Sequence, residues 1–167
     1  MKPYTVKNFL NKQDFKKLEN LIITESSFPL FFQPYVSDVK KERKTDCYFT
    51  HLVYHNNKIN SSYFENFKVI LDKLNIKKLI RIKVNYYYPT NKINIHYPHT
   101  DYDYSHKGCI LSLNTCDGFT IIENNTLKGL RIKSIKNSAL MFDPSIPHSS
   151  TTCTNCKGRF NININYL

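Results

Sequence analysis

The stretch "RFNININY", residues 159–166, alternates polar and apolar side chains without a break. Successive side chains of a β-strand point to opposite faces of its sheet, so this strand would be apolar on one face and polar on the other, with Arg159 at its start. The stretch "IKVNYYYP", residues 82–89, has a similar pattern, with Lys83 and Tyr87 on its polar side. Such strands are ordinary where one face meets water. They also suit a jelly-roll whose apolar side packs on helices and whose interior holds a polar ligand.

The other runs predict a mainly β chain with helices near its N-terminus. Apolar residues at helical spacing indicate amphipathic helices over 13–25 and 64–74, the second behind a capping box formed by Ser62 and Glu65. Arg81 and Lys83 share the polar side of one strand, which requires that end of the strand to reach solvent. Short runs rich in Ile, Val, Tyr and Phe, separated by turn residues, predict strands over 47–55, 76–88, 108–115, 119–123, 130–135, 139–143 and 159–166.

These elements predict a single domain over residues 1–167 with a double-stranded β-helix, the jelly-roll of the cupin type, and two or more helices packed on one face. Residues 1–75 would form a helical support region with one or more strands, and residues 76–167 the jelly-roll core. No apolar run approaches the ~20 residues that span a bilayer. The N-terminal stretch lacks the apolar region of a signal peptide, so we expect a cytoplasmic protein with no membrane contact.

The chain carries a formal net charge of +11, and lysine supplies most of its 24 basic residues. A charge of this size is typical of proteins that bind nucleic acid. The joint excess of Lys, Asn, Ile and Tyr is also what an AT-rich coding sequence produces. The densest basic run is "VKKERK", residues 39–44. The sequence leaves both explanations of the charge open.

Five cysteines, an odd number without a secretory signal, argue against a disulfide framework. Cys153 and Cys156 form one C-x-x-C pair, whereas a closed zinc site needs four ligands, usually as two such pairs. We therefore expect free thiols. Two non-enzymatic alternatives stay open: a zinc-stabilised nucleic-acid binder built on this pair, and a jelly-roll binding module with structural histidines.

The polar loop "HYPHTDYD", residues 96–103, offers two ligands for a metal ion. His99 and Asp101 are separated by one residue, so both side chains project from the same face of an extended segment. His148, just after a later predicted strand, could supply the third ligand. Two imidazoles and one carboxylate form the facial triad of non-haem Fe(II) oxygenases, which leaves positions open for a co-substrate and O₂. Arg159, eleven residues beyond His148, could clamp a carboxylate through two parallel hydrogen bonds.

Other side chains of this loop are weaker candidates. His96 could replace His99 as a ligand, but that choice leaves Asp101 poorly paired. His106 is expected to lie in the loop. The tyrosines that follow Asp101 could line the substrate entrance or, equally, pack on the rim of the barrel. The candidates for the entrance are Tyr102, Asp103 and Tyr104.

This order of features, H-x-D, a distal His and an Arg about ten residues later, resembles the 2-oxoglutarate/Fe(II)-dependent dioxygenase family. The likeness extends over about residues 76–167. The stretches "NYYYPTNKINIHYPHTD", "GCILSLNTCDGFTIIEN" and "RFNININ" look like the family's approach to the metal loop, the strands after it, and the Arg-x-Asn end of the site. Small single-domain members from marine phages and bacteria are similar, where a "GTTCT"-like segment follows the H-x-D loop; here that segment is residues 149–154, with Ser where Gly is usual. If phage-encoded, the protein would act in the host cytoplasm.

The resemblance implies Fe(II) as cofactor and 2-oxoglutarate and O₂ as co-substrates. It makes His99, Asp101 and His148 the catalytic metal ligands of an oxidoreductase. Such an enzyme hydroxylates a C–H bond and releases succinate and CO₂. The resemblance also implies four contacts to 2-oxoglutarate: Arg159, Tyr87, Asn85 and Asn161.

The resemblance leaves the substrate open. Prolyl hydroxylases of the family favour a protein side chain, and a small molecule is also compatible. The pairs Asn85-x-Tyr87 and Arg159-x-Asn161 resemble the AlkB-type demethylases, whose alkylated nucleic-acid substrate would suit the positive charge. Those enzymes carry a further Arg on the last strand, where this chain continues with asparagines. We therefore favour a hydroxylase of a protein or small molecule over a demethylase.

Overall fold

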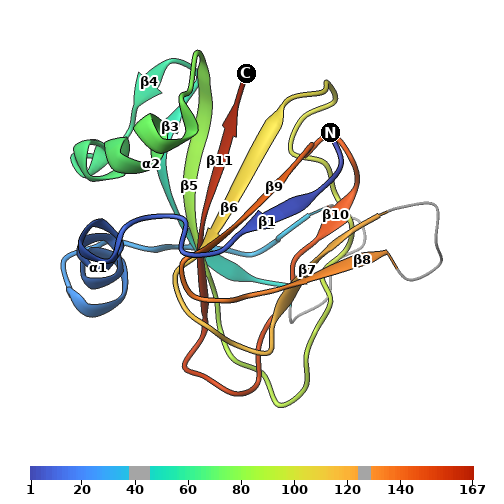
Figure 1. Ribbon diagram of the computed structural model, residues 1–167. Coiled ribbons are helices and arrows are strands. Elements are labelled where there is room, and N and C mark those ends of the chain that lie inside the picture. The colour runs from blue at the N-terminus through green and yellow to red at the C-terminus, as the bar shows by residue number, and fades with distance from the viewer. Residues whose placement is uncertain (38–45, 124–128) are drawn as a thin grey trace.

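The computed structural model describes residues 1–37, 46–123 and 129–167 (Figure 1). The basic run at 39–44 and an expected turn at 124–125 lie outside these ranges. The described chain is mainly β with helices near its N-terminus, as the sequence predicts. Among the described residues, no helix is long and apolar enough to cross a membrane.

The helices precede most of the sheet. They are α1 (Lys12–Glu19), which continues into the π-helical segment η1 (Asn20–Thr24), and the 3₁₀ segment η3 (Phe64–Phe67), which continues into α2 (Lys68–Leu74). The strands are β1 (Tyr4–Val6), β2 (Phe31–Gln33), β3 (Tyr48–His55), β4 (Lys58–Ile59), β5 (Leu79–Tyr87), β6 (Lys107–Ser112), β7 (Phe119–Ile122), β8 (Leu130–Lys133), β9 (Ser138–Phe142), β10 (His148–Ser149) and β11 (Arg159–Tyr166).

The strands form two antiparallel sheets. The large sheet has the order β1-β9-β6-β11-β5-β3-β2, with β4 paired to β3, and the small sheet has the order β10-β7-β8. Bridges from Ile95 to Thr151 and from His99 to His148 add the segment before β6 to the edge of the small sheet. Figure 1 shows the helices on one side of the large sheet and β7, β8 and β10 on the other. The two sheets form the expected double-stranded β-helix.

The apolar faces of β5 and β11 are buried beneath the helices. Ile82, Val84, Ile162 and Ile164 have no exposed surface, and they belong to the same core cluster as the apolar residues of α1, η1 and α2. Burial of this surface is the main favourable contribution to folding, at about 25 cal/mol per Å². The opposite, polar faces of the same two strands point toward the small sheet. The alternating pattern of residues 159–166 therefore places helices on one side of the sheet and a polar interior on the other.

Local capping differs from the prediction. Ser62 and Glu65 do not form a capping box, because η3 has no side-chain cap and the Tyr63 amide donates instead to the Ser61 hydroxyl at 3.1 Å. A tight 3₁₀ turn precedes α2, so the backbone amides to which a capping box would bond are not in the positions found at the start of an α-helix. Four short strands, β1, β2, β4 and β10, also lack a sequence signal, since two or three residues are too few to show a period.

Ile162→Ala tests the role of the helix-covered face. We expect this cavity to lower the free energy of unfolding by about 2–5 kcal/mol, measured by urea denaturation. Ile59→Ala is the matched control, because Ile59 lies on β4 and is 54% exposed. It should change the free energy of unfolding by less than about 0.5 kcal/mol. Equal losses in both variants would contradict the assignment of the core.

Candidate active site

Backbone pairing brings the three expected metal ligands together. The His99 amide donates to the His148 carbonyl at 3.0 Å, and the His148 amide donates to the His99 carbonyl at 2.9 Å. The side chains of such a directly opposed pair lie on the same face of the sheet, and the two imidazole centroids are 4.6 Å apart. Asp101 follows two residues later and is fixed by its amide, which donates to the Pro144 carbonyl at 3.0 Å. One ligand atom from each of the three side chains lies within 4.8 Å of the others.

The hydrogen bonds around this triad suit a divalent metal ion. The His148 ring places Nδ1 3.0 Å from the Ile146 carbonyl, which can only accept, so Nδ1 carries the proton and Nε2 keeps its lone pair for a metal. Burial lowers the pKa of both His99 and His148, which keeps the imidazoles neutral, the form that binds metal. The set has two neutral nitrogens and one carboxylate, the donor chemistry of a non-haem Fe(II) site.

The carboxylate of Asp101 is held by a cation and two amides. Arg81 Nη2 lies 2.6 Å from Oδ1, while Asn165 and Asn163 donate to Oδ2 at 2.9 and 3.2 Å. Burial alone would raise the pKa of Asp101, but Arg81 above all holds it well below its usual range. Asn165 also contacts His106 Nε2 at 3.1 Å, so His106, in the loop as expected, braces this network. Arg81 keeps 14% of its side chain exposed, so this end of the strand does reach solvent, and Asp101 provides its counter-charge.

Arg159 crosses from the large sheet to the small one. Its guanidinium donates to Ser134 Oγ at 2.6 Å, to Thr120 Oγ1 at 2.8 Å and to the Thr151 carbonyl at 3.2 Å, and lies 5.4 Å from the ring centroid of Tyr87. Only 2% of Arg159 is exposed. Among the described residues, every one of these partners is neutral and no carboxylate forms an ion pair with this guanidinium. A buried cation with no counter-charge is costly, so the Arg159 guanidinium would gain from an anionic partner.

The register of β5 and β11 aligns their polar side chains in pairs. Asn85 donates to Asn161 at 3.0 Å, and Thr50 on β3 in turn donates to Asn85 at 3.3 Å. Burial raises the pKa of Tyr87, so its hydroxyl stays protonated and able to donate. The cross-strand pairs are Arg159–Tyr87, Asn161–Asn85, Asn163–Lys83 and Asn165–Arg81.

One cavity connects His99 and His148 of the triad with Arg159. All four expected 2-oxoglutarate contacts line it together with these two histidines. Lys83 also lines this cavity. Its Nζ lies 3.4 Å from the Tyr48 hydroxyl, and burial lowers its pKa to about 8. Lys83 is half-buried, so it also keeps part of its surface in contact with solvent.

The remaining candidates of the metal loop lie outside the lining of this cavity. His96 packs on Tyr87 with ring centroids 5.4 Å apart and contacts the Ser150 hydroxyl at 2.8 Å, so His99 rather than His96 belongs to the triad. Tyr102 and Tyr104 pack on each other with centroids 5.5 Å apart, and Asp103 is exposed. A role of these three residues at the substrate entrance stays a prediction.

Several partners in the site had weak signals or none in the sequence. Thr120 stands on the inward-facing side of a predicted strand, which was its only signal. Ser134 follows a strand and carries no pattern of its own. Asn163 and Asn165 were visible as polar residues of the last strand, but their partner Asp101 is more than sixty positions away.

Comparison with solved structures identifies the fold. No protein-family model and no curated protein matches the chain. A prolyl hydroxylase from Trichoplax adhaerens, in complex with a peptide of hypoxia inducible factor, superposes with a TM-score of 0.72 at 14% identity, over 99% of this chain and 83% of that one. The chain has the fold of the 2-oxoglutarate/Fe(II) oxygenases.

Two further structures agree with this fold. An oxidoreductase of the 2OG-Fe(II) oxygenase family from Burkholderia pseudomallei has a TM-score of 0.68 at 10% identity, covering 98% of this chain and 84% of that one. A prolyl-4-hydroxylase from Pseudomonas putida has a TM-score of 0.65 at 10% identity, covering 98% and 91%. Since the sequences share so few residues, these structures establish the fold alone, and the reaction of this chain has to be inferred from its own side chains.

Asp143 gives the metal loop a pH-dependent support. Burial would raise the pKa of Asp143, but hydrogen bonds from Ser105, Ser145 and the His106 amide hold it at about 2. An unfolded aspartate titrates near 3.9, so the ionised form stabilises the fold above about pH 4, and this contribution is lost as the pH falls toward about 2.

Asp143→Asn should lower the free energy of unfolding at pH 7 by about 1–2 kcal/mol and should bring it close to that of the wild type near pH 2. Urea denaturation at several pH values measures this. Asp72→Asn, at an exposed position in α2, is the control and should leave the pH profile unchanged. A loss in Asp143→Asn that does not vary with pH would refute this role of the carboxylate.

Proposed function

We propose that this protein is a 2-oxoglutarate- and Fe(II)-dependent dioxygenase that hydroxylates a C–H bond of a protein side chain or a small molecule. The observation that carries the proposal is the buried guanidinium of Arg159, which has no counter-charge among the described residues and lines one cavity with His99 and His148 of the metal triad. A metal triad alone suits many reactions. A metal triad that faces a buried, unpaired cation suits a co-substrate that chelates the metal at one end and carries a carboxylate at the other.

The charges of the cavity match the two carboxylates of 2-oxoglutarate. Arg159 would pair with the distal carboxylate, with Tyr87 donating its hydroxyl to the same group. Asn85 and Asn161 lie between that end and the metal, where their amides can bind the co-substrate. Lys83 is a second cation that lines the cavity, on the metal side of the ladder, and Arg81 is already neutralised by Asp101. The site thus keeps two cations for a dianion.

His99, Asp101 and His148 would hold the iron, and the protein fixes them before any ligand arrives. Arg81, Asn163 and Asn165 keep the carboxylate ionised and oriented, while the Ile146 carbonyl sets the tautomer of His148. When bound, iron and 2-oxoglutarate supply the oxidation, in which O₂ converts 2-oxoglutarate to succinate and CO₂ and hydroxylates the substrate.

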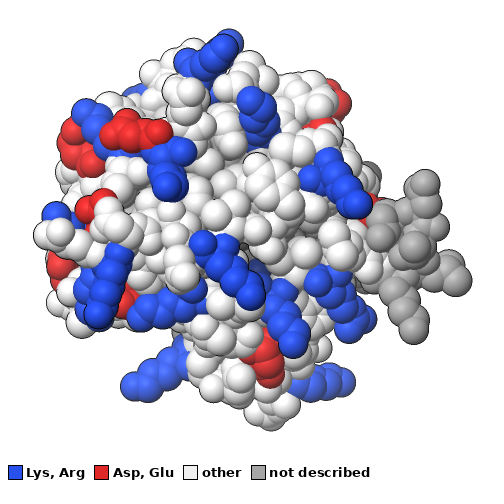
Figure 2. All heavy atoms as spheres, in the orientation of Figure 1, with Lys and Arg blue, Asp and Glu red and all other residues white. Residues whose placement is uncertain are grey.

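A protein substrate has support from a structural neighbour, the prolyl hydroxylase that binds a peptide. A small molecule is compatible with the same cavity. For a nucleic acid, the net charge would have to form a continuous surface, but Figure 2 shows basic side chains dispersed over this face with acidic ones among them. The last strand also differs from that of the demethylases, because Asn163 and Asn165 serve Asp101.

Metal binding tests the triad. We expect Asp101→Ala to weaken Fe(II) binding, measured by anaerobic titration, by at least about 100-fold, since loss of an outer-shell partner alone costs 10–100-fold. Asp103→Ala is the matched control, because this exposed carboxylate lies two residues away in the same loop. It should bind Fe(II) as the wild type does. If both variants bind Fe(II) equally well, the triad is wrongly assigned.

Arg159→Ala tests the co-substrate site. It should raise the dissociation constant of 2-oxoglutarate by at least about 30-fold, because it removes a buried charge pair worth 2 kcal/mol or more, while Fe(II) affinity stays unchanged. The charge-transfer absorbance of the Fe(II)–2-oxoglutarate complex reports both. Arg131→Ala, at an exposed position on β8, is the control. Loss of Fe(II) binding in Arg159→Ala would mean that Arg159 supports the metal rather than the co-substrate.

Succinate release with a panel of substrates decides the class. Peptides, free amino acids and alkylated oligonucleotides are compared side by side with the His148→Ala variant as background. Stimulation by a prolyl or other peptide supports a protein hydroxylase, and stimulation by free amino acids a small-molecule enzyme. If only oligonucleotides stimulate release, with a strong salt dependence, the demethylase replaces the hydroxylase.

A further inference from the structure

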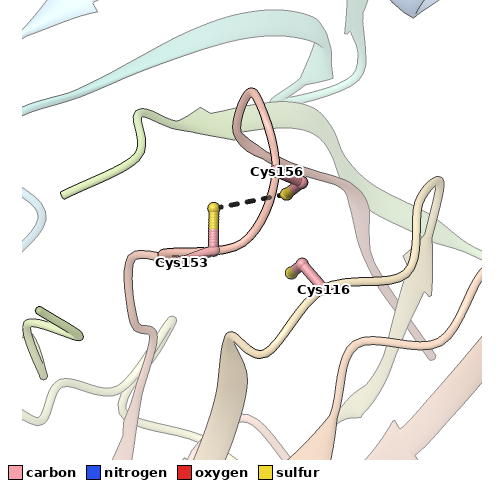
Figure 3. A group of neighbouring side chains, drawn as sticks. All are labelled: Cys116, Cys153 and Cys156. Carbon is pink, nitrogen blue, oxygen red and sulfur yellow. Dashed lines mark hydrogen bonds between the residues drawn. The ribbon is translucent and has the colours of Figure 1, made fainter. Parts of the chain in front are cut away.

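Three cysteines that are distant in sequence meet beside the active site. Cys116 lies in the turn between β6 and β7, and Cys153 and Cys156 lie in the loop between β10 and β11. Their Sγ atoms all lie within 4.8 Å of one another, and those of Cys153 and Cys156 are 3.5 Å apart. Figure 3 shows the three side chains converging from their two loops on one small space. Cys153 is fully buried and Cys116 is 7% exposed, whereas Cys156 is half-buried.

We infer that Cys116, Cys153 and Cys156 form a second metal site, which binds one thiophilic ion, Zn(II) or Cu(I), through three thiolates. Soft thiolate ligands select these ions over Fe(II), Mg(II) and Ca(II). The sequence shows only one C-x-x-C pair, and the fold adds the third thiol. The inference does not depend on the oxygenase activity, because neither the triad nor Arg159 supplies a ligand.

The spacing of the sulfurs suits a single ion. Zinc–thiolate bonds are about 2.3 Å long, so thiolates in a tetrahedral arrangement lie about 3.8 Å apart and those in a trigonal one about 4.0 Å. The Cys153 and Cys156 sulfurs, 3.5 Å apart, are slightly closer than these values, and all three pairs of sulfurs lie within 4.8 Å. Since Cys156 is half-buried, solvent can reach the fourth position of a zinc ion, and a trigonal Cu(I) ion needs no fourth ligand.

The two loops are joined by hydrogen bonds that do not involve sulfur. Asp117 accepts from the Thr154 amide at 2.8 Å and from its hydroxyl, and the Asp117 amide donates to Asn155 Oδ1 at 3.0 Å. Asn114 donates to the Gly158 carbonyl at 2.8 Å. These contacts hold the thiols together before a metal arrives, which lowers the ordering cost of binding.

A metal site explains the cluster better than a disulfide does. A disulfide would join two of the three sulfurs and leave the third beside it without a role.

The site would also brace the loop that leads into β11. Arg159 lies three residues after Cys156, and its acceptor Thr151 lies two residues before Cys153. The turn that contains Cys116 packs closely against Arg159 at Gly118, where a Cβ atom would lie 2.9 Å from Arg159 Cδ and 3.3 Å from Cys116 Sγ. An ion on the three thiols would tie this loop to the β6–β7 turn next to the guanidinium.

The test uses the full chain with His99→Ala and Asp101→Ala, which removes the triad as a competing metal site. Under reducing, anaerobic conditions, Zn(II) and Cu(I) are each titrated against a chromophoric chelator. We expect one tightly bound ion per chain, and sulfur-to-metal charge-transfer absorbance when Co(II) is used as a spectroscopic probe. Adding Cys116→Ser should weaken binding by at least about 100-fold and remove that absorbance. Cys47→Ser is the control, because this cysteine lies outside the cluster.

The relative affinities for Zn(II) and Cu(I) identify the preferred ion, and binding of either supports the site. Cys156→Ser, at the half-buried position, repeats the test if Cys116→Ser does not fold by circular dichroism. The inference is overturned if the triad-free protein binds neither ion, or if binding is unchanged in both serine variants. It is also overturned if thiol counting and intact mass show a Cys153–Cys156 disulfide that persists in the reduced preparation.

Discussion

The register between β5 and β11 is the constraint on which the site depends. Four alternate cross-strand pairs place Arg159 over Tyr87 at one end of the ladder and Asn165 beside Arg81 at the other. Between them, Ile82, Val84, Ile162 and Ile164 are buried under the helices. A shift by one residue would turn the whole polar set into the apolar core and the isoleucines into the cavity. The hydrophobic contact with the helices therefore fixes the orientation of the groups that face the ligand.

A polar interior of this kind is stable only if its charges and amides find partners. Asp101 is balanced by Arg81 and by two asparagine amides, so the metal loop is ordered without a metal. Arg159 has neutral partners that satisfy its geometry but not its charge. This difference separates the structural end of the ladder from the end that we propose binds 2-oxoglutarate. Because the hydrogen bonds of the guanidinium are satisfied, the protein can fold with this charge buried. Because the charge itself is not balanced, binding of an anion would still be favourable.

The small sheet contributes by closing the cavity rather than by supplying most of the core. Thr120 on one of its strands, and residues of the adjoining loops, accept hydrogen bonds from Arg159. The backbone pairing of His99 with His148 joins the metal loop to the edge of this sheet. The same arrangement places the turn after β6 against the loop before β11, where the three cysteines meet. Two adjacent features, one at the metal and one at the thiols, thus arise from how the two sheets close on each other.

The sequence by itself determined the features that repeat with a short period or stand at a fixed spacing. Alternation gave the two faces of β5 and β11, helical spacing gave α1 and α2, and the spacing of His99 and Asp101 put these two side chains on one face, because local geometry decides where neighbouring side chains point. His148 and Arg159 were candidates because the order of motifs resembles the oxygenase family. Only the tertiary structure decided the partner of Arg81, the short strands and the meeting of Cys116 with the C-x-x-C pair. These depend on contacts between residues far apart in the chain, whose pairing is set by the closure of the sheets and leaves no local pattern.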